Sequence, residues 1–293
     1  MGKTVRYITK DGSAFVVATD STNIVSKMEQ IHKTSAVVTA ALGRLVTASS
    51  LMGVMLKGKE DSVTLRMNGN GPTGALIAVS DSAGNTRGYV QKAVVEIPLN
   101  DKGKLDVAGA VGTDGSLYVI KDIGLKEPYS GMTPIVSGEI AQDITNYFVV
   151  SEQTPTVCAL GVLVNPDLSV NCAGGFLIQL LPGADENIVD LIEKAIQNIK
   201  PVTKMLSSGM TADDIAKTAM SGIEMDKLDE TDTDYICNCS KSRVEKALLS
   251  TGIDELTSML DDCPIKVECH FCDKIYEFTK DDIKKLIDIS TDK

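Results

Sequence analysis

Four cysteines near the C-terminus are the residues whose types and spacing could do chemistry. Cys237 and Cys239 form a C-x-C pair, and Cys269 and Cys272 form a C-x-x-C pair after an interval of 29 residues. Thiolates grouped two and two can surround Zn²⁺, which prefers sulfur ligands at about 2.3 Å in a tetrahedron. Four sulfur ligands leave no position open for a substrate. The pattern therefore predicts a structural or switching site and not a hydrolytic centre.

Other cysteine and histidine residues compete weakly for this role. Cys263 precedes a proline outside either pair, and His270 lies inside the C-x-x-C turn, where we expect its ring to point outward. Cys158 and Cys172 lie in apolar, strand-like sequence, which predicts inert core thiols. His32 is the other of only two histidines, and neither has neighbours that suggest a catalytic triad, so histidine-based catalysis has little support.

A glycine-rich segment resembles a nucleotide-binding fingerprint only in its letters. Residues 69–74 read Gly-Asn-Gly-Pro-Thr-Gly and follow a predicted strand. A dinucleotide fingerprint must open a helix, whereas residues 75–80 continue as a strand. A turn between two strands is the better interpretation.

The elements that must position the cysteines fall into three predicted parts with an α+β fold. Residues 1–183 form an N-terminal α+β core domain. Its strands are predicted at Thr4–Lys10, Ser13–Thr19, Ser62–Asn68, Gly74–Ser80, Thr86–Val90, Leu117–Ile123, Val157–Asn165 and Ser169–Cys172, and its helices at Asn23–Lys33, Ala36–Leu56 and Glu139–Val149.

Residues 184–234 are predicted to be an amphipathic, acidic and metastable linker. Apolar residues recur at helical spacing from Ile188 to Ile199, and Thr211 with Asp214 forms a capping box for a second helix. These helices are either ordinary core or a reversible cover over an apolar surface of the first domain. The segment Glu224–Asp234 is too polar for a core, so we expect it to be poorly ordered.

Residues 235–293 are predicted to form a small C-terminal zinc-binding α+β domain. Ser242 with Glu245 is expected to cap a helix, a second helix is expected at Asp254–Asp261, Val267–Phe278 suits a hairpin, and Thr279 with Asp282 caps a last helix. A domain of fewer than sixty residues with so little apolar surface needs a bound metal or another cross-link to fold.

Composition and charge exclude several classes of function. The net charge is −11, and residues 184–234 contain 12 acidic against 5 basic residues. Because phosphate backbones attract lysine and arginine, an acidic, metal-bearing half argues against nucleic-acid binding. The chain shows no secretory signal and no run approaching about 18 apolar residues, so we expect a cytoplasmic protein without a membrane partner.

The motifs taken together resemble those of the bacterial heat-shock protein 33 family, the 33 kDa chaperonins. The likeness lies in the Cys237–Cys239 and Cys269–Cys272 motifs, in Ser151–Pro155 and Ala173–Gly183, and in Asn70–Gly74 with Arg87–Tyr89. It covers nearly the whole chain.

The resemblance implies a redox-regulated, ATP-independent holdase and not an enzyme. One Zn²⁺ per chain would be held by Cys237, Cys239, Cys269 and Cys272 in the reduced, inactive state. Oxidation would release the zinc and form the redox-active disulfides Cys237–Cys239 and Cys269–Cys272. The oxidised form would be a homodimer that binds unfolded or oxidatively damaged client proteins under stress. Cys263 is not part of the family pattern and makes mispairing possible.

Two other functions remain open from the residues alone. A cytosolic thiol–disulfide oxidoreductase could use Cys269 and Cys272, although a thioredoxin-like βαβ context is missing. A metal-dependent nucleic-acid regulator is disfavoured by charge.

Overall fold

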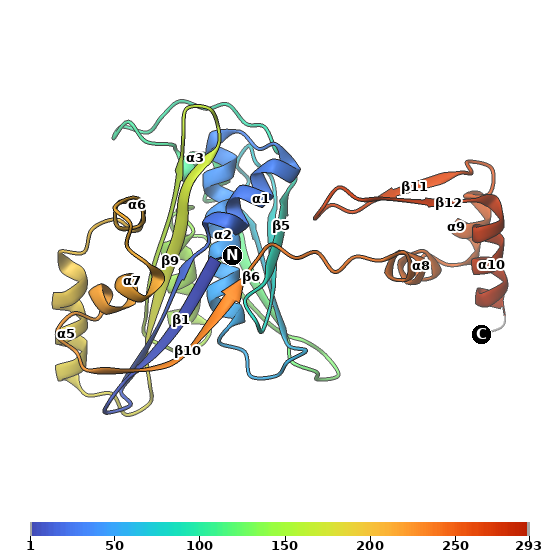
Figure 1. The fold of residues 1–293 in the computed structure, drawn as a ribbon. Helices are drawn as coiled ribbons and strands as arrows, with labels where there is room; N and C mark the ends of the chain where they lie inside the picture. The colour runs from blue at the N-terminus through green and yellow to red at the C-terminus, as the bar shows by residue number, and fades with distance from the viewer. Residues whose placement is uncertain (1, 292–293) are drawn as a thin grey trace. The chain divides into compact units, whose positions relative to one another are not determined.

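The computed structural model describes residues 2–291 of the chain. The chain divides into two compact units, Met1–Ile236 and Cys237–Lys293. The first unit contains two five-stranded antiparallel sheets, and the second contains a two-stranded hairpin with three helices (Figure 1). The predicted α+β fold class is confirmed.

The first sheet brings the two ends of the first unit together. Its strand order is β10-β1-β2-β9-β8, so the last strand pairs with the first. Most of these strands carry Val, Ile, Leu and Phe, which suit a pleated, half-buried surface. The bounds are β1 Gly2–Thr9, β2 Ala14–Asp20, β8 Thr156–Val164, β9 Val170–Leu180 and β10 Met225–Thr233.

The second sheet has the order β5-β4-β3-β6-β7. Its bounds are β3 Ser62–Asn68, β4 Leu76–Asp81, β5 Thr86–Val90, β6 Ser116–Asp122 and β7 Tyr129–Pro134. The glycine-rich segment 69–74 joins β3 to β4, as the turn interpretation predicts. A Cβ atom on Gly69 would lie 2.0 Å from the Gly112 carbonyl oxygen, so this close backbone approach requires glycine.

Helix α2, Ala36–Gly53, forms the centre of the main core, which contains residues from both sheets. Helices α1 Thr22–His32, α3 Val107–Val111 and α4 Ala141–Val150 complete this part. Within the described residues, α2 is the one helix that is long and apolar enough to cross a membrane by length and composition alone. Because 89% of its most apolar window is buried, α2 reads as the core helix of a folded domain.

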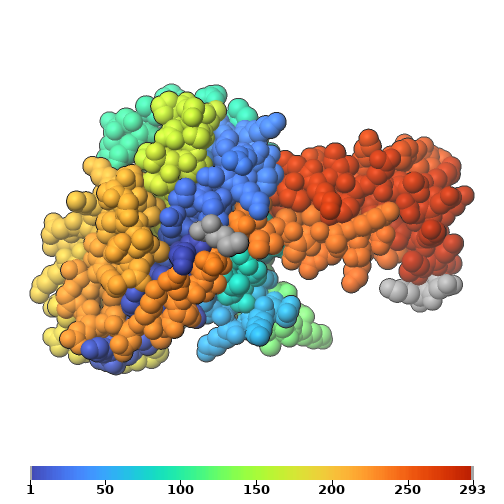
Figure 2. Space-filling model, viewed as in Figure 1, coloured from blue at the N-terminus to red at the C-terminus, as the bar shows by residue number. Residues whose placement is uncertain are grey.

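The linker lies on the other face of the first sheet. It contains α5 Glu186–Gln197, α6 Val202–Ser207 and α7 Ala212–Ala219, followed by β10. The helices share a second apolar core with β1, β2 and β9. In Figure 2 the gold and orange atoms of residues 184–235 form a continuous surface on one side of this unit.

Strand β10 corrects one prediction. The high polarity of Glu224–Asp234 predicts a poorly ordered segment, but its residues Met225–Thr233 form a strand that pairs along its full length with β1. Charged side chains provide the partners: Arg6 contacts Asp229, and Lys3 contacts Glu230. A charged edge strand of this kind is common, because charge at a sheet edge prevents pairing with other chains.

The second unit has its own small core around Leu256, Phe278 and Ile283. Its elements are α8 Lys241–Leu249, α9 Ile253–Ser258, β11 Ile265–Glu268, β12 Ile275–Phe278 and α10 Lys280–Thr291. Thr279 and Asp282 cap α10 as predicted. The capping box predicted at Ser242 is wrong: the N-cap of α8 is Ser240, which accepts a hydrogen bond from the Arg243 amide.

Candidate metal centre and linker contacts

The four cysteines come together from two loops of the second unit. Cys237 and Cys239 lie in the segment before α8, and Cys269 and Cys272 lie in the turn between β11 and β12. That turn is closed by backbone hydrogen bonds to the Cys269 carbonyl oxygen from the amides of Cys272 at 3.2 Å and Asp273 at 2.8 Å. The turn therefore presents both of its thiols on one short, rigid segment.

The geometry of the four sulfurs suits a tetrahedral metal ion. All four Sγ atoms lie within 4.8 Å of one another. Cys237 Sγ lies 3.7 Å from Cys269 Sγ, and Cys239 Sγ lies 3.4 Å from Cys272 Sγ. A tetrahedron with metal–sulfur bonds of about 2.3 Å has sulfur–sulfur edges of about 3.8 Å. The group can thus hold a metal ion, and it is the one group of this kind within residues 2–291.

The protonation of these thiols depends on their neighbours. Burial raises the pKa of Cys239, but hydrogen bonds from the Tyr276 hydroxyl group, at 3.1 Å, and from nearby thiols outweigh burial and lower the pKa to about 7. Burial raises the pKa of Cys237 well above its usual range, and burial also raises the pKa of Cys272. The Tyr276 hydroxyl group therefore stabilises the Cys239 thiolate by hydrogen bonding, and a bound cation would favour the thiolate form of its ligands.

The rival residues stay outside this group. Cys263 donates a hydrogen bond to the Met259 carbonyl oxygen at 3.4 Å, and His270 is exposed. Cys172 is buried, and Cys158 is partly buried in apolar surroundings. Burial raises the pKa of Cys158 to about 12. Both thiols therefore have the character of the predicted inert core cysteines.

The disulfide pairs Cys237–Cys239 and Cys269–Cys272 stay a prediction. The Cys237–Cys269 and Cys239–Cys272 sulfur contacts cross between the pairs, as the edges of a tetrahedron do, and all seven cysteines are free thiols. The C-x-x-C motif lies in the turn of an antiparallel hairpin and not in a βαβ unit. The oxidoreductase alternative gains nothing from this setting.

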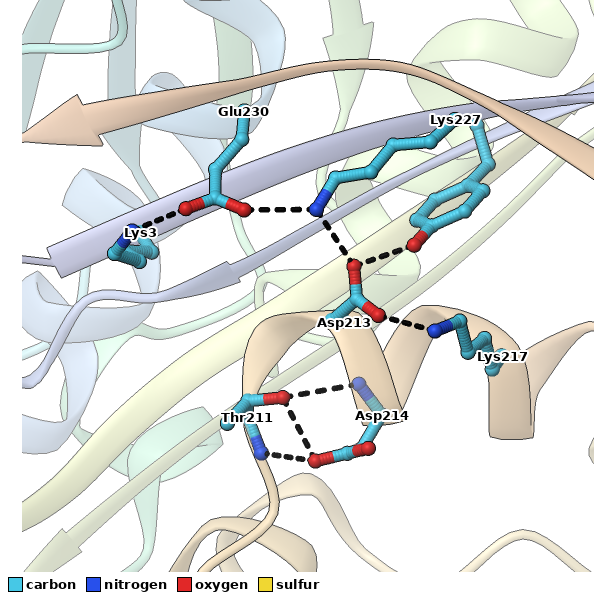
Figure 3. Close-up of polar contacts among 8 residues, drawn as sticks. Lys3, Thr211, Asp213, Asp214, Lys217, Lys227 and Glu230 are labelled. Atoms are coloured by element: carbon cyan, nitrogen blue, oxygen red, sulfur yellow. Dashed lines mark hydrogen bonds and ion pairs between the residues drawn. The ribbon is translucent and has the colours of Figure 1, made fainter.

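A network of charged residues that the sequence reading missed connects the linker to the sheet. Asp213, at the start of α7, contacts Lys217 on the same helix and Lys227 on β10 (Figure 3). Lys227 also contacts Glu230, which contacts Lys3 on β1. The i,i+4 spacing of Asp213 and Lys217 is a local signal that indicates their pair. Lys3 and Glu230 are 227 positions apart, and no local sequence signal indicates that contact.

The linker ends at a buried anchor. Tyr235 is 2% exposed, and its hydroxyl group donates a hydrogen bond to the Gly88 carbonyl oxygen at 2.9 Å. The amide of Ile236 bonds the Thr86 carbonyl oxygen at 3.0 Å. Ile236 is the one residue between Tyr235 and the first cysteine of the group, Cys237.

Comparison with known proteins identifies the family. A family model described as "Hsp33 protein" matches residues 2–279. The chain belongs to the Hsp33 family. A relative named 33 kDa chaperonin from Clostridium beijerinckii is 45% identical over 289 residues, covering 98% of this chain and 99% of the relative. Another of that name, from Lachnoclostridium phytofermentans, is 50% identical over 268 residues and 91% of each chain.

A solved Hsp33 structure agrees with the fold. The crystal structure of the 33 kDa chaperonin (heat shock protein 33 homolog) from Thermotoga maritima gives a TM-score of 0.89 at 33% identity, with 99% of each chain covered. The resemblance drawn from the cysteine motifs is confirmed.

Proposed function

We propose that the chain is a redox-regulated, ATP-independent holdase chaperone of the cytoplasm. The chain has three functional parts. The N-terminal domain, residues 1–183, binds clients and dimerises. The metastable linker is residues 184–234, and the redox switch is residues 235–293. The observation that carries the proposal is the cluster of four thiols in a small unit joined directly to a linker that covers an apolar sheet face.

In the reduced state, Cys237, Cys239, Cys269 and Cys272 would hold one Zn²⁺. When bound, the ion supplies most of the folding free energy of such a unit, since structural zinc binding contributes about 10–16 kcal/mol at neutral pH. The apolar core around Leu256, Phe278 and Ile283 is too small to replace it.

Oxidation removes the ligands in pairs. Each disulfide forms with the loss of two electrons and two protons from two thiols, and peroxide takes these up to give two molecules of water. The pairs we propose are Cys237–Cys239 and Cys269–Cys272. A disulfide sulfur no longer binds the ion as a thiolate does, so the second unit loses its main source of stability.

Release of the linker would then expose the client surface. We define the linker-covered face as the first-sheet residues that pack under α5, α6 and α7: Val5, Tyr7, Ala14, Val16, Ala18, Cys172, Phe176 and Ile178. Strand β10 pairs with β1 along its backbone, but its side chains are mostly exposed and charged, so it buries less apolar surface than a central strand does. Unfolding of the adjoining unit frees the chain up to the Tyr235 anchor.

The test is to oxidise the metal-loaded protein with peroxide at raised temperature and to assay a thermally unfolding enzyme without nucleotide. The proposal expects suppression of aggregation by the oxidised protein and none by the reduced protein. Equal suppression by both forms, or by neither, would remove it.

A further inference from the structure

Strand β8 has an open edge. It lies at the end of the first sheet and pairs only with β9. The amide of Leu180 on β9 donates to the Pro155 carbonyl oxygen at 3.2 Å. Because hydrogen-bonding direction alternates along an antiparallel strand, Leu160 and Val162 direct their N–H and C=O groups away from β9. Within residues 2–291, no backbone hydrogen bond from outside the sheet reaches these outward groups.

A cavity runs beside this edge. It has a volume of about 820 Å³ and is lined by the six consecutive residues 159–164. Its lining also contains Leu99 and Leu105 and the linker residues Ile199 and Val202. Its volume is within the range of ligand sites, about 300–1,000 Å³. The space therefore follows β8 and has apolar residues from the first unit and its linker in its lining.

The charges around the cavity have one sign. Its lining contains the basic residues Arg44, Lys104, Lys200 and Lys204 and no acidic residue. Arg44 contacts Glu139, whereas the three lysines form no ion pair with any residue of the described chain. The cavity lining is therefore positively charged, although the protein as a whole has a net charge of −11. Such a site attracts a negatively charged ligand.

We propose that the outer edge of β8 binds an extended, acidic segment of an unfolded protein by adding it as a strand. A peptide backbone fits because it pairs with the outward N–H and C=O groups of Leu160 and Val162, which a simple anion does not. The lysines favour acidic side chains of the bound segment, and the apolar lining residues contact its apolar side chains. That the bound segment belongs to a client protein rests on the proposed function. That an extended peptide adds as a strand to β8 does not depend on it.

The edge and the linker-covered face are continuous. Phe176 lines the cavity and also belongs to that face. The edge is open while the linker is docked, so it supplies a weak site in the reduced protein. Linker release adds the large apolar face beside it. A client held first at the edge would then extend across the face.

The test uses the reduced, full-length protein and a fluorescent, end-capped hexapeptide of alternating glutamate and valine. Fluorescence anisotropy should show binding that weakens with salt. The same peptide with alternate amides N-methylated should bind about tenfold more weakly, because two hydrogen bonds worth about 0.5–1.5 kcal/mol each are lost. A peptide with lysine in place of glutamate should not bind.

A pair of variants separates the site from general charge effects. Lys104→Glu places an acidic residue in the cavity lining and should weaken binding of the acidic peptide about fivefold. Lys126→Glu makes the same change in net charge at an exposed lysine outside the lining and should leave binding unchanged. Circular dichroism of both variants checks that each remains folded.

Three results would overturn the inference while leaving the chaperone function intact. Equal affinity for the N-methylated and unmodified peptides would mean that the edge is not paired. Binding of decanoate but not of the peptide would mean a small-molecule cavity. A change in the dimerisation of the chain by Lys104→Glu, with no peptide binding, would assign this edge to an interface between copies. Failure of client protection with peptide binding preserved would instead contradict the chaperone function.

Discussion

The hydroxyl group of Tyr7 on strand β1 donates a hydrogen bond to the carboxylate of Asp213 on linker helix α7. Asp213 also contacts Lys217 and Lys227, so one carboxylate joins the sheet, the helix and strand β10 (Figure 3). The network lies at the surface, where ion pairs contribute little individually. Its contacts therefore add only modestly to the docking of the linker.

Asp213→Asn should loosen the linker. The change removes the charge that attracts Lys217 and Lys227 but keeps a hydrogen-bond acceptor for Tyr7. We expect a loss of about 1 kcal/mol in linker docking, as for a small network of partly exposed pairs. Limited proteolysis of the reduced protein should cut residues 184–234 faster. Asp190→Asn, an exposed position on α5 outside the network, is the control and should be cut at the wild-type rate.

Linker docking should resist mild acid. Burial raises the pKa of Asp213, but hydrogen bonds from Lys217, Tyr7 and Lys227 outweigh burial and hold the pKa well below its usual range. A lowered folded-state pKa contributes stability that is complete above the unfolded-state pKa, about 3.9, and that disappears as the pH falls further. The difference in thermal midpoint between wild type and Asp213→Asn should be constant from pH 7 to 5 and shrink below pH 4. A difference that shrinks between pH 7 and 5 would contradict this assignment.

Cys172 should report linker release. Its side chain is 5% exposed, and its Sγ donates to the Thr203 carbonyl oxygen of α6 at 3.5 Å. Loss of α6 would expose the thiol, so alkylation by iodoacetamide should become about tenfold faster or more after oxidation. Cys158 packs against the main core and is the internal control. Peptide mapping by mass spectrometry measures both sites; an unchanged rate at Cys172 would mean that the linker stays docked.

Cys239→Ser should abolish tight metal binding, whereas Cys263→Ser should not. Cys239 lies in the four-sulfur group and accepts a hydrogen bond from Tyr276, while Cys263 lies outside the group. Losing even part of a metal contribution of about 10–16 kcal/mol exceeds the reserve of a small unit. Metal content and the exchange of amide hydrogens in residues 237–291 should separate the two variants. Normal metal content in Cys239→Ser would rule this ligand out.

Sequence reasoning succeeded where local chemistry decides the structure. The four cysteines, the caps at Thr211 and Thr279, and the strands with alternating apolar residues all depend on short-range patterns. Strand β10 was missed because its Asp, Glu and Lys residues are uncommon in strands, and its pairing depends on Lys3 and Arg6 at the other end of the unit. The cap at Ser240 was missed because two serines compete and backbone geometry selects one.

Contacts between distant residues could not be predicted. Tyr7 and Asp213 are 206 positions apart, and nothing in either local sequence indicates the other. The same holds for the anchor of Tyr235 on Gly88. These contacts decide how the linker is held, so the switch could be predicted from the sequence but its attachment could not.

The most direct test follows one sample of the zinc-loaded protein as peroxide is added at raised temperature. Zinc release, alkylation of Cys172 and protection of an unfolding enzyme are measured against time. Our account predicts that zinc leaves first and that the exposed thiol and the protection then rise together. The account would be contradicted if all of the zinc were released while Cys172 stayed unreactive and the unfolding enzyme still aggregated. Loss of the metal would then leave the client surface covered.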